Sequence, residues 1–324
     1  MDLRLALFEL AARHRLDAGA TQRLQQLAGF GEEPASLPRR WALGTAVLGA
    51  ALGGLGILFW IAANWASLGR FGRFALLQSV VVVMCAGALA RPGARAPLSL
   101  LALLATGGLF AYFGQTYQTG ADAWQLFALW ALLALPLALA VRSDVVWTPW
   151  TLVAMSAIAL WVQAHTGHEW RVQPDDLRAH LTGWLLGAVV LASLSPALQR
   201  ISGAGVWSLR SALTLWVVLV TSTALGGLFH RDVAPHYGWG VAVFAVAAAA
   251  FASRRFGDLY GLSAVALGFD TLLVAGLARW LLEGHRGDWI GPLLLIGLAA
   301  AGLLAATVSA ILKLGRRTSA ETAR

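Results

Sequence analysis

An uncharged run of 26 residues, from Trp41 to Ala66, constrains this chain more than any other feature. As an α-helix it is long enough to cross the roughly 30 Å hydrocarbon core of a bilayer. About nine further apolar blocks follow, and charged residues make up only 12% of the chain, whereas a soluble domain carries about 25%. The sequence therefore predicts an all-α, polytopic bundle of transmembrane helices.

The apolar blocks predict about ten spans within residues 39–314, preceded by an arm at 1–38 and followed by a tail at 315–324. The expected spans lie near 41–66, 74–90, 97–114, 124–141, 145–163, 181–198, 211–229, 238–252, 259–282 and 289–312.

The arm is expected to form a short pair of cytoplasmic, amphipathic helices. Residues 2–15 carry apolar side chains at helical spacing, and a second helix is expected near 18–28, with Asp17 as its N-cap. Arg4 and Glu9 interrupt any signal-peptide core, so no cleavable signal peptide is expected. The arm either packs on the protein or the membrane interface, or binds a cytoplasmic partner protein.

The basic residues of the connections are unevenly divided between the two sides of the membrane. Twelve fall on one side and six on the other, which predicts that both termini are cytoplasmic. Loop arginines facing anionic headgroups explain the net charge of +8, so the lipid bilayer, and no nucleic acid, is the expected partner. The twelve are Arg39, Arg40, Arg91, Arg95, Arg142, Arg200, Arg210, Arg254, Arg255, Lys313, Arg316 and Arg317.

Tryptophan and glycine suggest how the spans are anchored and packed. Many of the 15 Trp residues lie at block ends, Trp147 and Trp184 among them, as in an aromatic belt at the headgroups. Gly49 and Gly53 have GxxxG spacing, and Gly56 lies nearby. We expect these glycines to serve helix packing within the bundle, or else a homo-oligomer formed through the first span.

Three segments resemble a bacterial family of predicted membrane proteins, domain of unknown function 2157. They are LDAGATQRL at 16–24, GILFWIAANW at 56–65 followed by Arg70 and Arg73, and FGQTYQTGADAWQLFALWALLALPLAL at 113–139. The resemblance covers the first 140 residues best. It implies a multi-pass protein of the bacterial inner membrane and brings no activity that can be carried over residue by residue.

Polar side chains within or beside the spans are the candidate functional residues, because they are costly in hydrocarbon. Asp270 lies near the middle of a span and is interpreted either as a proton or cation site or as a hydrogen-bonded core residue. Asn64 ends the first span as a ligand contact or as an amide bound to nearby backbone, and Gly114 and Gly120 are expected to break the third. The candidate polar cavity comprises Asn64, Gln115, Tyr117, Gln118, Asp122 and Asp270.

Enzymatic and metal chemistry receive little support from the sequence. His165 and His168 in HTGHE are weak metal candidates, because HxxH alone is a weak spacing signal. We expect no metal site, no cofactor and no enzymatic activity, since no catalytic motif is present. Six histidines are assigned to outer loops: His165, His168, His180, His230, His236 and His285.

Two functions remain open. The protein either moves or senses a small solute or proton through a polar cavity, or it is a membrane-anchored scaffold whose arm binds a cytoplasmic partner.

Overall fold

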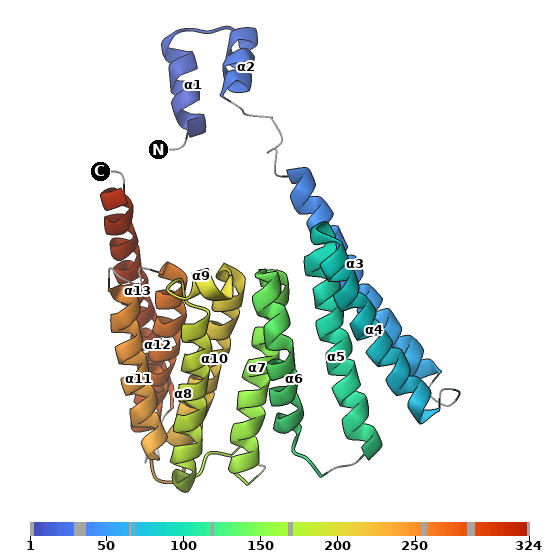
Figure 1. Ribbon diagram of the computed structural model, residues 1–324. Helices are drawn as coiled ribbons and strands as arrows, with labels where there is room; N and C mark the ends of the chain where they lie inside the picture. The colour runs from blue at the N-terminus through green and yellow to red at the C-terminus, as the bar shows by residue number, and fades with distance from the viewer. Residues whose placement is uncertain are drawn as a thin grey trace. The chain divides into compact units, whose positions relative to one another are not determined.

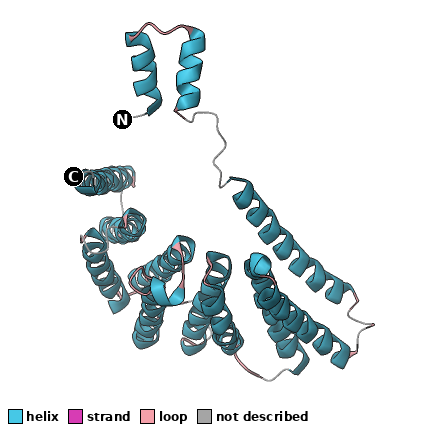
Figure 2. Ribbon diagram, turned by 45° about the horizontal axis from the view of Figure 1, so that its top comes forward, coloured by secondary structure: helices cyan, strands magenta, loops and turns pink. Residues whose placement is uncertain are grey.

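The computed structural model describes residues 3–28, 37–64, 67, 69–117, 120–167, 171–253, 258–283 and 289–322. Every regular element in these ranges is a helix (Figures 1 and 2), which confirms the all-α class. The chain divides into two compact units, residues 1–49 and residues 50–324.

The first unit contains a helical pair and the beginning of a long helix. Helices α1 (Leu3–Arg13) and α2 (Ala18–Leu27) contact each other, and α3 (Leu37–Ala63) begins in this unit. Asp17 caps α2, because its Oδ1 accepts a hydrogen bond from the Ala20 N–H at 2.7 Å. The predicted helical arm and its cap are therefore present.

The second unit continues α3 from residue 50 and adds the remaining helices. In chain order these are α4 (Arg70–Ala90), η1 (Pro92–Ala94), α5 (Arg95–Tyr117), α6 (Ala123–Val141), α7 (Asp144–His165), η2 (Pro174–Asp176), α8 (Leu177–Ser193), α9 (Gln199–Ser202), α10 (Val206–Leu228), α11 (Pro235–Ala252), α12 (Leu259–Leu282) and α13 (Ile290–Thr322). Within the described ranges, nine helices are long and apolar enough to cross a membrane. A polytopic bundle is thereby confirmed.

The one predicted span that is not among these nine, at 181–198, forms the shorter helix α8. It has 17 residues and ends at Ser193, near the lower limit of about 17 residues for a spanning helix. The predicted end at 198 is wrong, and Pro196 gives the physical reason. Proline disfavours helical backbone in the residue before it and cannot donate a helical hydrogen bond.

Helix α10 is the centre of the second unit. It packs against α7, α8, α11 and α12, while α5 packs against α4, α6 and α7. Half of the apolar window of α10 is buried, whereas none of that of α13 is. The outer helices therefore present their apolar surface to lipid, and the core lies along α7 and α10.

Several tryptophans lie in this core instead of at the membrane surface. Trp147 and Trp184 were predicted to be belt residues, but both are buried. The Trp147 indole N–H donates to the Ser202 carbonyl and that of Trp184 to Thr223 Oγ1, each at 2.9 Å. A buried indole N–H needs such a partner, and position at a block end does not reveal whether one exists. The exposed tryptophans among the described residues are Trp41, Trp60, Trp207, Trp239, Trp280 and Trp289.

The glycines of the first span pack differently from the GxxxG expectation. A Cβ atom added at Gly53 or Gly56 would meet nothing within 4 Å, whereas one at Gly54 would lie 3.1 Å from Leu101 Cδ2. Gly54 is thus the residue through which α3 approaches α5. The predicted packing role is wrong for Gly53 and Gly56 within this chain, because they face away from α5. A role in a homo-oligomer stays a prediction.

The carboxylate of Asp144 caps the start of α10 from another helix. Asp144 is the first residue of α7, and its Oδ1 accepts hydrogen bonds from the Gly205 N–H at 2.8 Å and the Ser208 hydroxyl at 2.7 Å. Its Oδ2 accepts from the Trp207 N–H at 2.9 Å. A Cβ at position 205 would collide with this carboxylate. Glycine is therefore required where the two segments meet.

Replacing Asp144 by Ala should destabilise the second unit by about 2 kcal/mol, because the N–H groups of Gly205, Trp207 and Ser208 lose a charged acceptor. Thermal unfolding of the detergent-solubilised protein, followed by tryptophan fluorescence, measures the effect. Asp17→Ala is the matched control, since Asp17 caps an exposed helix of the arm. It should leave the main transition unchanged. Equal melting of Asp144→Ala and the unaltered protein would contradict the prediction.

Candidate functional site

The predicted polar residues of α3 and α5 lie at helix ends and have local partners. The Asn64 side-chain N–H donates to the Trp60 carbonyl at 2.9 Å, as expected of an amide that binds nearby backbone. Gln115 is exposed. Tyr117 is 46% exposed, with its ring centroid 5.8 Å from that of Phe74. Neither side chain points into a closed interior.

The predicted break in the third span occurs later than expected. Helix α5 continues through Gly114, where a Cβ would lie 2.9 Å from Leu126 Cδ1, and it ends at Tyr117. Gly114 thus serves the approach of α6 and does not interrupt the helix. Gly120 has a left-handed backbone with φ of +66°, and Asp122 is the N-cap residue of α6. Gln118 lies outside the described residues.

Asp270 is buried in the middle of α12, far along the chain from the other candidates. It is 7% exposed, and its Oδ1 accepts a hydrogen bond from the Thr307 hydroxyl of α13 at 3.2 Å. Its Oδ2 has no hydrogen-bond partner among the described residues. Because α12 packs against α10, α11 and α13, whereas α5 packs against α4, α6 and α7, the predicted cavity residues form two separate groups.

His165 lies beside a shallow hollow at the end of α7. Its Nδ1–H donates to the Trp161 carbonyl at 2.8 Å, and its ring stacks on Trp161 with centroids 4.2 Å apart. His168 lies outside the described residues. Among the residues that the structure describes, no three His, Cys, Asp or Glu side chains are grouped to hold a metal ion. The hollow, of about 320 Å³, is lined by Trp161, His165, Asp175, Asp176, Arg178, Ala179 and Thr182.

Two histidines that the sequence analysis assigned to outer loops form a buried pair instead. His180 on α8 and His236 on α11 are 4% and 0% exposed. His236 Nε2 lies 3.2 Å from His180 Nδ1, and the rings are nearly perpendicular at 85°. His180 Nδ1 also lies 3.0 Å from the Asp176 carbonyl oxygen. His236 Nδ1 has no partner within the described ranges.

Local sequence explains how the two rings come together. Pro235 occupies the first turn of α11, a position where proline favours helix initiation, and this places His236 inside the helix. A Cβ at Gly227 of α10 would lie 2.7 Å from the His236 Cβ. The absence of a side chain at position 227 therefore allows α11 to approach α10 closely. In the sequence, Pro235 directly before His236 is the feature that could have indicated that this histidine begins a helix and does not lie in a loop.

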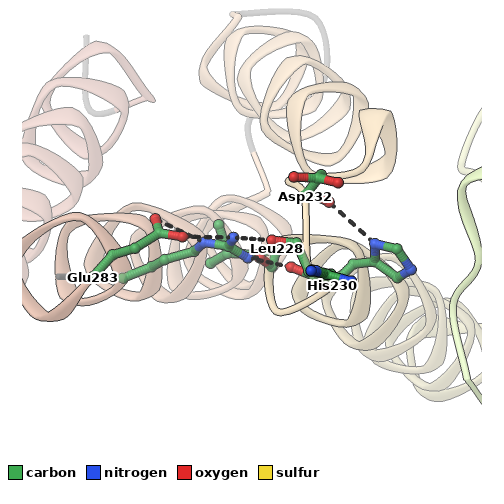
Figure 3. Close-up of polar contacts among 6 residues, drawn as sticks. Leu228, His230, Asp232 and Glu283 are labelled. Atoms are coloured by element: carbon green, nitrogen blue, oxygen red, sulfur yellow. Dashed lines mark hydrogen bonds and ion pairs between the residues drawn. The ribbon is translucent and has the colours of Figure 1, made fainter.

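Arg279 of α12 binds main-chain carbonyls at the same end of the bundle, as Figure 3 shows. The Arg279 guanidinium donates to the main-chain oxygens of Leu228, of His230 at 2.7 Å and of Arg231 at 3.1 Å. These carbonyls terminate α10, where cations are favoured by the helix dipole. Glu283 holds the guanidinium from the other side at 3.0 Å. Arg279 was not among the candidate residues predicted from the sequence, although a charged side chain inside the apolar block 259–282 could have indicated it.

Comparison with known proteins finds a family match in the N-terminal half of the chain. Residues 8–147 match the family model described as "Predicted membrane protein (DUF2157)". The match includes the segments 16–24, 56–65 and 113–139, so the resemblance noted in the sequence is confirmed. The polar residues of α8 to α12 lie beyond the matched range. No curated protein and no solved structure matches the chain.

Replacing Arg279 by Gln should destabilise the bundle by about 2–3 kcal/mol, because carbonyls at the end of α10 lose a charged donor. Urea or thermal unfolding in detergent measures the change. Glu283→Gln is the control, because Glu283 is 61% exposed and an exposed ion pair contributes only about 0–1 kcal/mol. If both variants unfold together with the unaltered protein, Arg279 does not stabilise this end.

Proposed function

We propose that the protein is a non-enzymatic protein of the bacterial inner membrane that moves or senses a proton or another small solute. The single observation that carries this proposal is the buried carboxyl of Asp270. One of its oxygens accepts from Thr307, and the other has no partner among the described residues.

The energetics of Asp270 favour an exchangeable proton. An ionised Asp at the centre of a spanning helix costs about 2.5–3.5 kcal/mol on insertion scales. A proton on Oδ2 removes that charge while Oδ1 keeps its bond to Thr307. Intramembrane carboxyls of this kind commonly mark proton and ion paths. Asp270 is therefore the residue at which we infer that the solute binds.

The alternative function is a membrane-anchored scaffold, and the arm supports it. Phe8, Leu10 and Leu27 are 58%, 48% and 86% exposed. Large apolar side chains on both helices of the pair offer a surface to a cytoplasmic partner. In this reading the spans anchor the arm, and Asp270 is a structural, protonated core residue.

We infer that both termini are cytoplasmic. The contacts of the second unit support the division of basic residues on which this rests. Arg142 donates to the Arg200 carbonyl at the start of α9, and Arg210 lies 4.9 Å from the ring of Tyr260 at the start of α12. Arg142, Arg200 and Arg210, which are assigned to the same side of the membrane, thus lie at one end of the bundle. Arg231 follows the predicted span 211–229 and is one of the six basic residues on the other side. Its carbonyl accepts a hydrogen bond from the Arg279 guanidinium at the end of α12.

Asp270→Asn should abolish proton movement while leaving folding intact or improved, because the amide keeps an acceptor for Thr307 but cannot release a proton. Proteoliposomes containing a pH-sensitive dye measure flux, and thermal unfolding measures stability. Asp258→Asn is the matched control, since Asp258 caps the same helix at its beginning and should retain flux. Normal flux in Asp270→Asn would exclude Asp270 as the site and favour the scaffold.

Reporter fusions test the orientation. Fusions after Arg95 and after Arg255 should report the cytoplasm, and a fusion after Asp232 should report the opposite side, because positive residues are retained on the cytoplasmic side. Alkaline phosphatase and green fluorescent protein fusions provide complementary readouts. Phosphatase activity after Arg95 or Arg255 would contradict the proposed orientation.

A further inference from the structure

We propose that His180 and His236 form a proton-binding relay at the end of the bundle where α8, α10 and α11 meet. The ligand of this site is a proton, and the pair passes it from one imidazole to the other. The proposal deepens the proposed function, because it rests on proton movement through the protein for the role of the pair. Proton binding by the pair can be measured without any flux.

The geometry of the pair creates competition for one proton. The His180 Nδ1 atom lies 3.0 Å from the Asp176 carbonyl oxygen and 3.2 Å from His236 Nε2. The carbonyl can only accept, so it favours a proton on His180 Nδ1. The His236 contact works in either direction, because each neutral ring has one donor and one acceptor nitrogen.

Two arrangements of the neutral pair follow. In the first, His180 Nδ1–H faces both the Asp176 carbonyl and the His236 Nε2 lone pair, and His236 carries its proton on Nδ1. In the second, His236 Nε2–H donates to the His180 Nδ1 lone pair, and His180 carries its proton on Nε2. The second arrangement loses the Asp176 bond, whereas the first leaves a buried His236 N–H without a partner among the described residues. In the second arrangement the buried His236 Nδ1 lone pair also lacks a donor among the described residues. Each arrangement thus leaves buried polar groups unsatisfied, and neither satisfies the whole pair.

Passage of one proton converts the first arrangement into the second. A proton binds His180 Nε2, and His180 transfers its Nδ1 proton to His236 Nε2. His236 then releases its original proton from Nδ1. Two N–H bonds form and two break, and the single positive charge that enters at His180 leaves at His236.

A shallow hollow lies next to His180 in the chain, lined by its neighbours Ala179 and Asp176. Asp176, whose carbonyl contacts His180, also lines the 320 Å³ hollow with Asp175 and Arg178. On the other side, Tyr237 follows His236 and donates to the Leu272 carbonyl of α12 at 3.1 Å, two residues from Asp270. The charged or titratable groups at this end of the surrounding elements and in their described connections are His165, Arg171, Asp175, Asp176, Arg178, His230, Arg231, Asp232, Tyr237, Arg279 and Glu283. Farther along the same elements are Asp144, Arg210, Tyr260 and Asp270.

A metal ion is the competing ligand, and the proton is favoured over it. Two imidazole nitrogens bound to one tetrahedral Zn²⁺ lie about 3.3 Å apart, close to the separation in this pair. However, a stable zinc site needs at least three protein ligands. Within the described ranges no third His, Cys, Asp or Glu completes such a group.

Nuclear magnetic resonance of the full chain in lipid nanodiscs tests the relay. With ¹⁵N-labelled histidine, imidazole shifts report tautomer and charge as the pH is lowered from about 8 to about 3. We expect His180 and His236 to exchange between tautomers and to titrate as a coupled pair. His236→Gln should leave His180 fixed with its proton on Nδ1, bonded to Asp176.

His230→Gln is the matched control for this experiment. His230 lies at the same end of the bundle, but it is only partly buried and its Nδ1–H donates to the Asp232 carbonyl at 3.2 Å, so its loss should leave the signals of the pair unchanged. Size-exclusion chromatography and thermal unfolding confirm that each variant is folded. A single His180 tautomer throughout the pH range, unaffected by His236→Gln, would overturn the relay. Saturable Zn²⁺ binding that depends on both histidines would also overturn it.

Flux measurements separate this proposal from the proposed function. If proteoliposomes move protons, His180→Gln and His236→Gln should each lower the flux at least about tenfold. Coupled titration without any flux in the unaltered protein supports the proton-binding pair and contradicts proton movement. Flux that is unchanged in both histidine variants overturns the relay and leaves the proposed function intact.

Discussion

Two charged residues hold the ends of α10, the helix on which the second unit depends. Asp144, from α7, accepts hydrogen bonds at its beginning, and Arg279, from α12, donates to the carbonyls at its end. The negative group lies at the positive end of the helix dipole and the positive group at its negative end. Helices α7, α8, α11 and α12 all pack against α10. The two capping side chains therefore fix the helix around which most of the core is packed.

The same requirement explains the interior tryptophans. Hydrocarbon offers no water to a polar group, so each buried N–H must be bonded within the protein. Trp150 donates to the Ala131 carbonyl and Trp216 to the Trp184 carbonyl, both at 2.8 Å. Each indole therefore ties one helix to another. Among the residues that the structure describes, a few buried groups depart from this rule, including His236 Nδ1 and Asp270 Oδ2. The proposed proton site at Asp270 and the proposed histidine relay each contain one of them.

The two unsatisfied groups lie in different parts of the bundle. The histidine pair lies beside a hollow that opens at the end of the bundle, whereas Asp270 lies near the middle of α12. Chains of Asp, Glu and His side chains form the proton relays of pumps and transporters, and these residues are of those types. The exposed apolar side chains of the arm are independent of this arrangement, and a partner could occupy them whether or not protons move.

The sequence by itself determined the class of the fold, most span positions and the helical arm with its Asp17 cap. These follow from local properties, since apolar length and capping residues act within one segment. It also identified Asp270 as a polar residue in a span. Only the tertiary structure decided that Trp147 and Trp184 are internal, that Gly54 instead of Gly53 meets α5, and that His180 and His236 are paired. Those outcomes depend on which face of one helix meets another, and hydropathy carries no information about that choice.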